Sequence, residues 1–254
     1  KTTSTTPSVT YKANGTLYAL TSDGKNLSGT ATYTVSKIDT SAPTASISVG
    51  TVKTDRATVT ASCADSESSI TKYEFSKDNG STWTANGTTS SYTFTGLTKE
   101  TSYTYKVRCT NGSGLTNTAS KASSTLGMTN PIIAEASKTP ASGYDYATER
   151  VIKITYSSTN IQSPVYYFKS TVAGTVASGV VTQACGTGTN PGTCSSSSVT
   201  TLAANTWYKT TSTTPSITYK ANGTLYALTS DGKNLSGTAT YTVSKIDTSA
   251  PSAS

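Results

Sequence analysis

The chain has 254 residues and a formal net charge of +7, from 20 lysines and arginines against 13 aspartates and glutamates. Its residues are 33% hydrophobic and 13% charged, below the roughly 45–50% and about 25% of ordinary soluble domains. Histidine is absent, which excludes Ser-His-Asp and Cys-His nucleophile pairs and removes the commonest metal ligand. The acidic residues are scattered through turn sequences, so we predict a protein that is not an enzyme and holds no cofactor or metal.

The positive charge is spread thinly along the chain. Only three basic residues are arginines, and no run of like charge occurs, whereas nucleic-acid-binding surfaces cluster their basic residues. We therefore predict a solvated surface and no nucleic-acid partner. The sequence has no stretch of about 18 apolar residues, so we also expect no membrane span in this part of the protein.

The first 46 residues of the chain recur at its end. Residues 1–46 align with residues 209–254 at a constant offset of 208. Only two positions differ, Val9 against Ile217 and Thr44 against Ser252. A fixed period is the sequence signature of a repeat array. We therefore expect a window from a longer tandem array, whose partners are neighbouring repeats and identical chains in a filament.

Threonine, valine, isoleucine and tyrosine occur in short alternating runs, which suit pleated strands. The segments between these runs are rich in glycine, asparagine, aspartate, serine and proline, which form turns. Many short strands at close spacing are typical of β-sandwiches. The sequence therefore predicts an all-β chain of tandem sandwiches.

Proline marks the joints between the predicted segments. Pro43 and Pro251 each end the sequence KIDTSAP, and Pro131 follows a second break. Proline donates no backbone hydrogen bond, biases the preceding residue to extended geometry and stiffens linkers, so we expect short, semi-rigid joints. The predicted segments are residues 1–39, the C-terminal half of a longer sandwich; 40–125, a shorter sandwich; 126–247, a longer sandwich with an insertion; and 248–254, the start of the next repeat.

Two runs within residues 40–125 alternate between core-facing and outward side chains. The core-facing residues are Val59, Ala61 and Cys63 in the run ATVTASC, and Tyr103, Tyr105, Val107 and Cys109 in the run TSYTYKVRC. Because side chains of a strand alternate between its two faces, both cysteines share a face with the core residues of their strands.

The stretch GLTKETSYTYKVRCTNGSG resembles the sixth strand of fibronectin type III domains. Leu97, Thr101 and Tyr103 stand at the spacing of the tyrosine corner of that family, while Lys99 and Glu100 replace its Pro-Gly. The resemblance implies a fibronectin type III-like sandwich for residues 40–125, with an architecture shared by immunoglobulin-like domains.

Residues 126–247 contain candidate strands at 150–156, 165–169, 216–219, 223–229 and 238–244. The end of this segment is similar to the last two strands of bacterial immunoglobulin-like repeats from surface proteins, which close on an Ile-Asp-x-x-x-Pro joint. The similarity implies an immunoglobulin-like sandwich. The strand 223–229 offers apolar groups on both faces, Leu225 with Ala227 and Tyr226 with Leu228. We expect one of these faces to meet a neighbouring domain or subunit.

The four cysteines allow three pairings. The resemblance to immunoglobulin-like sandwiches implies a disulfide between Cys63 and Cys109 across the sheets. For the other two we favour a bond from Cys185 to Cys194 within the insertion CGTGTNPGTC. Zinc sites favour close C-x-x-C pairs, which this spacing lacks. Disulfides form in oxidising compartments, so we expect an extracellular or cell-surface location.

The sequence SKDNGSTW resembles the Asp-box of sialidase propellers and contributes Asp78, Gly80 and Trp83. In that family the aspartate caps backbone amides, the glycine takes a positive φ and the tryptophan packs beneath. A propeller needs one box per blade, and the box occurs once here, so we predict a structural turn. Residues 65–67 (DSE) and 22–26 (SDGKN, repeated at 230–234) lack the alternating acids of a calcium loop, so we expect aspartate-capped turns there also.

These features predict a structural segment of an exported bacterial surface or filament protein, acting as a stalk, fibre or adhesin shaft. The alternative is a glycan- or protein-binding adhesin module, with host or envelope glycans as partners and a site on loops or on the insertion closed by Cys185 and Cys194. The aromatic residues available to such a site are Tyr166, Tyr167, Phe168, Trp207 and Tyr208.

The two copies of the repeated sequence differ in the strands available to them. The second copy has residues 150–169 of its own chain as partner strands, whereas the first copy has no such segment ahead of it in this sequence. An isolated two-stranded sheet is marginal in water. We therefore expect residues 1–38 to be ordered only when strands equivalent to 150–169 come from a preceding repeat or a neighbouring chain.

Overall fold

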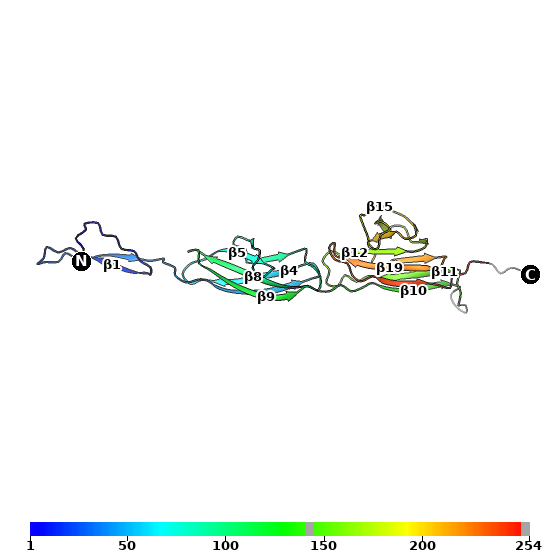
Figure 1. Ribbon diagram of the computed structural model, residues 1–254, viewed down its shortest axis with the longest axis horizontal. Coiled ribbons are helices and arrows are strands. Elements are labelled where there is room, and N and C mark those ends of the chain that lie inside the picture. The colour runs from blue at the N-terminus through cyan, green and yellow to red at the C-terminus, as the bar shows by residue number, and fades with distance from the viewer. Residues whose placement is uncertain (141–144, 250–254) are drawn as a thin grey trace, which may run out of the picture. The chain divides into compact units, whose positions relative to one another are not determined.

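The computed structural model describes residues 1–140 and 145–249 (Figure 1). Every helix or strand assigned in these residues is a β-strand, which confirms the predicted all-β class. The described residues include no helix that is long and apolar enough to cross a membrane. Of the expected next-repeat segment 248–254, residues 250–254 lie outside the described residues, and with them Pro251 of the second joint.

The chain divides into two compact units. The first comprises Lys1–Thr51, Thr58–Phe94 and Ser102–Ser123, and the second comprises Val52–Ala57, Thr95–Thr101 and Ser124–Ser254. Two short loops that connect strands of the shorter sandwich therefore belong to the second unit.

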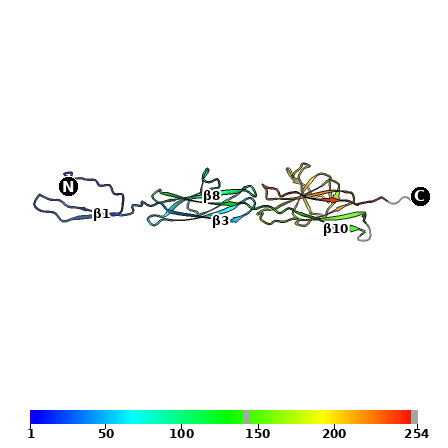
Figure 2. The same cartoon turned by 60° about the horizontal axis from the view of Figure 1, so that its bottom comes forward.

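The first unit begins with a two-stranded antiparallel sheet, β1 (Gly15–Ala19) and β2 (Ala31–Val35). The shorter sandwich follows, with one sheet in the order β3-β4-β7 and the other in the order β6-β5-β8-β9. Figure 2 labels one strand of each sheet, β3 and β8. Its strands are β3 (Thr44–Val52), β4 (Ala57–Ala64), β5 (Ile70–Ser76), β6 (Thr84–Ala85), β7 (Ser91–Phe94), β8 (Ser102–Asn111) and β9 (Thr116–Ser124). The arrangement is the fibronectin type III-like sandwich that the sequence resemblance implies.

A disulfide connects the two sheets of the shorter sandwich. Cys63 on β4 is bonded to Cys109 on β8. Core-facing and outward residues alternate along both strands as predicted, with Val59 and Val107 fully buried and Thr60 exposed.

The longer sandwich, in the second unit, also has two sheets. Their strand orders are β10-β11-β18-β13-β16 and β15-β14-β17-β12-β19-β20. The strands are β10 (Ile132–Thr139), β11 (Glu149–Thr155), β12 (Val165–Ser170), β13 (Gly174–Thr175), β14 (Val181–Ala184), β15 (Ser195–Ser196), β16 (Thr201–Leu202), β17 (Trp207–Thr210), β18 (Ser216–Tyr219), β19 (Gly223–Ser230) and β20 (Ala239–Val243). The five predicted strands are present as β11, β12, β18, β19 and β20, each within one residue of its expected bounds.

The core of the longer sandwich draws fully buried side chains from both sheets. They are Ile152, Ile154, Phe168, Leu202, Ile217, Tyr219, Leu225 and Ala227. Strand β19 therefore turns Leu225 and Ala227 into this core, and it pairs with β12 on one side and β20 on the other.

The other face of β19 is covered by the chain itself. Leu228 is 1% exposed. It packs with Trp207, on β17, and with Cys185, at the start of the insertion. Tyr226 packs against the same cluster. The expectation that one face of this strand meets a neighbouring domain or subunit is therefore wrong for the second copy, because the insertion folds over that face.

Candidate functional site

The two copies of the repeated sequence have the same local structure. β1 pairs with β2 in the first copy, and β19 pairs with β20 in the same register in the second. The loop between the strands is closed in the same way, because Thr21 N–H donates to Ser28 Oγ at 2.8 Å and Thr229 N–H donates to Ser236 Oγ at 2.9 Å. Differences between the copies therefore come from what surrounds them.

The second copy is surrounded by partner strands. β18 pairs with β11 and β13, and β19 pairs with β12, so residues 150–169 supply partner strands as expected. In the first copy residues 8–11, the counterpart of β18, form no strand. Within the described residues, β2 is the single partner of β1 (Figure 1).

Without partner strands, the first copy exposes a set of apolar side chains on both sides of its two-stranded sheet and beside it, and we call this set the open face. The exposed fractions are 61% for Val9, 67% for Tyr18, 50% for Leu20, 70% for Leu27 and 69% for Tyr33. Their counterparts in the second copy are buried or half-buried, with Ile217 at 0% and Leu228 at 1%. Tyr33 pairs with Leu17, so it lies on the opposite face of the sheet from Tyr18, and apolar side chains are uncovered on both faces. Exposed apolar side chains of this size are typical of surfaces that contact another chain or domain.

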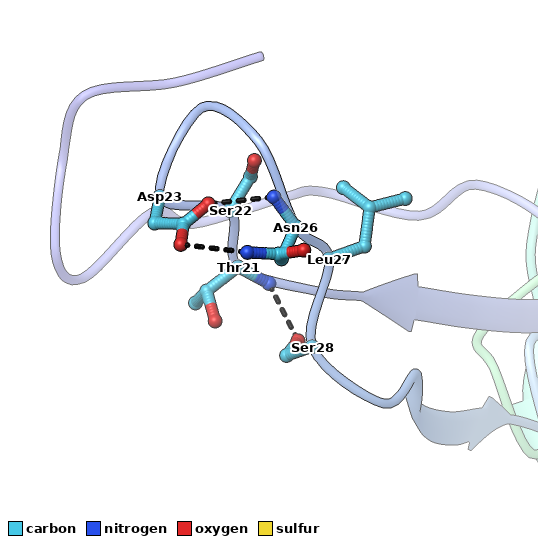
Figure 3. A pocket seen from close by; sticks show the side chains of 6 residues that line it. All are labelled: Thr21, Ser22, Asp23, Asn26, Leu27 and Ser28. Atoms are coloured by element: carbon cyan, nitrogen blue, oxygen red, sulfur yellow. Dashed lines mark hydrogen bonds between the residues drawn. The ribbon is translucent and has the colours of Figure 1, made fainter.

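The loop between β1 and β2 contains the SDGKN turn of residues 22–26 (Figure 3). Asp23 Oδ1 accepts the N–H groups of Asn26 and Lys25 at 2.6 and 2.8 Å, and Asn26 Nδ2 donates to Asp23 Oδ2 at 3.2 Å. These bonds lower the pKa of Asp23 to about 2, and the bond from the Asn26 backbone has the largest effect. The turn is capped by aspartate as predicted, and with its flanking residues it lines a shallow open hollow.

The acidic residues 65–67 belong to a polar network at the joint, which also uses Asn111. Asp65 Oδ1 accepts the N–H of Ser68 at 2.9 Å, and Asn111 Nδ2 donates to Asp65 Oδ2 at 3.2 Å and to Asp39 Oδ2 at 2.8 Å. Ser68 Oγ donates to the same Asp39 oxygen at 2.5 Å. The network attaches the joint residue Asp39 to the shorter sandwich.

The residues of the Asp-box sequence lie close together in a turn after β5. Asp78 Oδ1 accepts the Ser76 hydroxyl at 2.6 Å and the Thr82 N–H at 2.9 Å. Gly80 has a φ of +91°, and a Cβ there would lie 3.2 Å from Trp83 Cζ2, so a larger residue would be strained. These contacts are the ones expected of a structural turn, and that role of Asp78, Gly80 and Trp83 stays a prediction.

Two carboxylates in the shorter sandwich make its stability sensitive to acid. The Arg108 guanidinium, 2.7 Å from Glu74, is the main cause that lowers the pKa of Glu74 from 4.5 to about 2, against the effect of burial. The Ser76 hydroxyl is the main cause that lowers the pKa of Asp78 to about 2. A carboxylate with a depressed folded-state pKa contributes stability above its unfolded-state pKa, and this contribution is lost as the pH falls through the folded-state pKa.

We therefore expect the free energy of unfolding of this sandwich to fall as the pH is lowered from about 4.5 to about 2. Urea unfolding across this range measures the slope. Glu74→Gln is expected to be less stable at neutral pH and to have a shallower acid slope than the unchanged chain. An identical slope in the variant would contradict the assignment to Glu74.

The residues assigned to the tyrosine corner lie at the start of β8 and in the loop before it. Leu97 is fully buried. The N–H of Thr101 donates to Thr125 Oγ1 at 3.0 Å. Tyr103 is half-buried, with its ring centroid 6.1 Å from that of the fully buried Tyr105. That the three residues form a tyrosine corner stays a prediction.

The insertion closed by the disulfide from Cys185 to Cys194 packs against the aromatic residues proposed for a binding platform. Four of them are buried and one, Tyr167, is half-buried; the buried ones are Tyr166, Phe168, Trp207 and Tyr208. Trp207 Nε1 donates to the carbonyl of Gly188 at 3.0 Å, which fixes its ring under the insertion. These five residues therefore form no exposed stacking platform.

Comparison with known proteins gives likenesses in structure alone. No family model matches the chain, and no curated protein matches it. The PKD1 domain of Vibrio anguillarum Epp is similar at 19% identity, over 34% of this chain and 95% of that chain, with a TM-score of 0.29. A two-domain fibronectin type III segment of chicken tenascin is similar at 10% identity, over 78% of this chain and 97% of that chain, with a TM-score of 0.31. The fibronectin(III)-like modules of Clostridium thermocellum CbhA are similar at 11% identity, over 78% and 92%, with a TM-score of 0.28. The β-sandwich class of this chain rests on its own sheets.

Proposed function

We propose that the chain is a structural tandem-repeat segment of an exported surface or filament protein, acting as a stalk, fibre or adhesin shaft without catalysis. The observation that carries this proposal is the contrast between two copies of one sequence. Apolar side chains that are covered in the second copy form the open face of the first. In an array with a period of 208 residues, each such face is covered by strands of the repeat before it.

Burial of the open face joins neighbouring repeats by side-chain packing as well as by the peptide chain. Removing one large apolar side chain from water contributes about 1.5–3 kcal/mol. The counterparts of Val9 and Tyr33 pack in the core with side chains of β11 and β12. Those of Tyr18, Leu20 and Leu27 pack with Trp207 and Cys185. The five side chains therefore supply a strong drive for the partner strands and the insertion of a preceding repeat to cover the first copy. A repeat completed in this way resists separation from its neighbour, which suits a mechanical role.

Two further observations support the proposal. Both disulfides fit an extracellular location, because they form and persist in oxidising compartments. The polar network around Asp39 holds a joint residue against the sandwich that follows it, which limits rotation at the joint. A stalk needs stiff joints of this kind.

Extending the chain with its own sequence tests the proposal. Placing residues 126–208 ahead of Lys1 recreates the junction between Tyr208 and Lys209, because Lys1 aligns with Lys209. We expect the amides of β1 and β2 to exchange rapidly in the unextended chain and about 1000-fold or more slowly in the extended one. Local fraying costs almost no free energy, whereas opening a core strand requires most of the global free energy of unfolding.

Hydrogen exchange followed by mass spectrometry measures the difference, since peptides with Val9 differ in mass from those with Ile217. Strands β19 and β20 are the internal standard and stay protected in both chains. An extension carrying Phe168→Asp, at a fully buried position, is the matched control and restores rapid exchange. Equal protection of the two copies in an unextended monomer, or no gain on extension, contradicts the proposal.

A further inference from the structure

In the second copy the SDGKN turn, residues 230–234, is engaged by two loops. They are Val52–Ala57 and Thr95–Thr101, which belong to the same compact unit as the turn, and we call them the docking loops. Thr54 Oγ1 donates to Asp231 Oδ2 at 2.6 Å. Thr54 is 0% exposed and Asp231 is 9% exposed, so this hydrogen bond is shielded from water.

The asparagine of the same turn binds the backbone of the second docking loop. Asn234 Nδ2 donates to the carbonyl oxygen of Leu97 at 3.1 Å, and Asn234 Oδ1 accepts the N–H of Lys99 at 3.3 Å. The ammonium group of Lys233 donates to the carbonyl oxygen of Gly96. Three backbone groups of this loop are thus matched by two side chains of the turn.

The carboxylate of the turn is ionised although it is buried. Burial acts to raise the pKa of Asp231, but hydrogen bonds from Asn234, Thr54 and the backbone of the turn outweigh it and lower the pKa. Arg56, in the first docking loop, adds a positive charge near this carboxylate. A buried carboxylate needs its hydrogen bonds to be satisfied, so the docking loops complete the environment that the aspartate requires.

In the first copy, the same turn has no hydrogen bond from its aspartate or asparagine side chain to another loop of the described residues. The bonds inside the turn match those of the second copy: Asn26 N–H donates to Asp23 Oδ1 at 2.6 Å, and Asn234 N–H donates to Asp231 Oδ1 at 2.6 Å. Among the described residues, the side chains of Asp23 and Asn26 bond within the turn, and both are exposed (Figure 3). A turn that already has its bound geometry loses little entropy on docking.

We propose that the SDGKN turn of residues 22–26 is a docking site for a second pair of docking loops, with the sequences of Val52–Ala57 and Thr95–Thr101. The partner is a fibronectin type III-like module of this sequence joined ahead of the chain, so the inference rests on the proposed function. Asp23 then accepts the hydroxyl of the module's threonine, and Asn26 pairs with the module's loop backbone.

The test compares two extended chains. One carries residues 126–208 ahead of Lys1 and supplies the partner strands alone; the other carries residues 40–208 and supplies the docking loops as well. Asp23→Asn is introduced into each, and exchange of the amides in residues 21–28 is followed in peptides that contain Val9. In the chain with docking loops, we expect the amides of residues 21–28 to exchange about tenfold faster in the variant than in its parent. The reason is that the threonine of the docking loop loses its hydrogen bond to a buried carboxylate.

In the chain extended by residues 126–208 alone, Asp23→Asn is expected to speed exchange less, since the backbone bonds to Oδ1 remain and only the bond from Asn26 Nδ2 to Oδ2 is lost. Asp231→Asn is the matched control in the docked second copy and is expected to speed exchange of residues 229–236 about tenfold. Equal effects of Asp23→Asn in the two extended chains would overturn the docking site, even where the shorter extension protects β1 and β2. Failure of the shorter extension to protect these strands would instead overturn the proposed function.

Discussion

Leu228→Ala is expected to lower the free energy of unfolding of the longer sandwich by about 3 kcal/mol, because large-to-small core substitutions lose buried area and leave a cavity. Leu228 is 1% exposed and packs with Trp207 and Cys185. Urea unfolding followed by Trp207 fluorescence, in a Trp83→Phe background, measures the change.

The repeated sequence supplies the control for this substitution. Leu20 is the counterpart of Leu228 and has the same sequence neighbours, but it is 50% exposed. Leu20→Ala is expected to change stability by less than about 0.5 kcal/mol, as at ordinary surface positions. Similar losses from the two substitutions would mean that the first copy is covered in solution and that our account of the open face is wrong.

Loss of the inter-sheet disulfide is expected to have a still larger effect. The bond between Cys63 and Cys109 closes a loop over 46 residues, for which chain entropy corresponds to about 4 kcal/mol. Replacing both cysteines with alanine is therefore expected to lower the melting temperature of the shorter sandwich by about 15 °C or more. Differential scanning calorimetry of the full chain gives the shift.

The second disulfide provides a comparison within the same chain. Cys185 and Cys194 are nine residues apart, which corresponds to about 2.7 kcal/mol in the same treatment. Replacing this pair with alanine is expected to destabilise the longer sandwich by the smaller amount and to leave the shorter one unchanged. A larger effect at this bond than at the inter-sheet bond would show that packing of the insertion, rather than loop entropy, sets the stability.

Much of the fold could be predicted from local patterns. The alternation of Val59 and Ala61 with threonine and serine identified the core face of β4, and the run TYTV identified β2 and β20. The five strands predicted in the longer sandwich are long enough to show such alternation. Strands of two residues, such as β13 and β16, carry too few side chains to reveal a period, and they were missed.

The candidate site was predicted in part. The lack of partner strands for the first copy follows from the repeat and from where residues 150–169 lie in the chain. The docking loops were missed, because nothing in the sequences around Thr54 and Leu97 marks them as partners of a turn far along the chain. Hydrogen bonds such as that from Thr54 to Asp231 depend on how distant segments meet, so no local pattern records them.

By itself, the sequence determined which residues form strands, which cap the turns and which face of each main strand is apolar, since these properties depend on neighbours a few residues away. The SDGKN turn forms the same internal bonds in both copies for this reason. Only the tertiary structure decided which apolar faces are covered. Leu20 and Leu228 share their local sequence but differ in exposure, because burial depends on strands and loops brought together from distant parts of the chain.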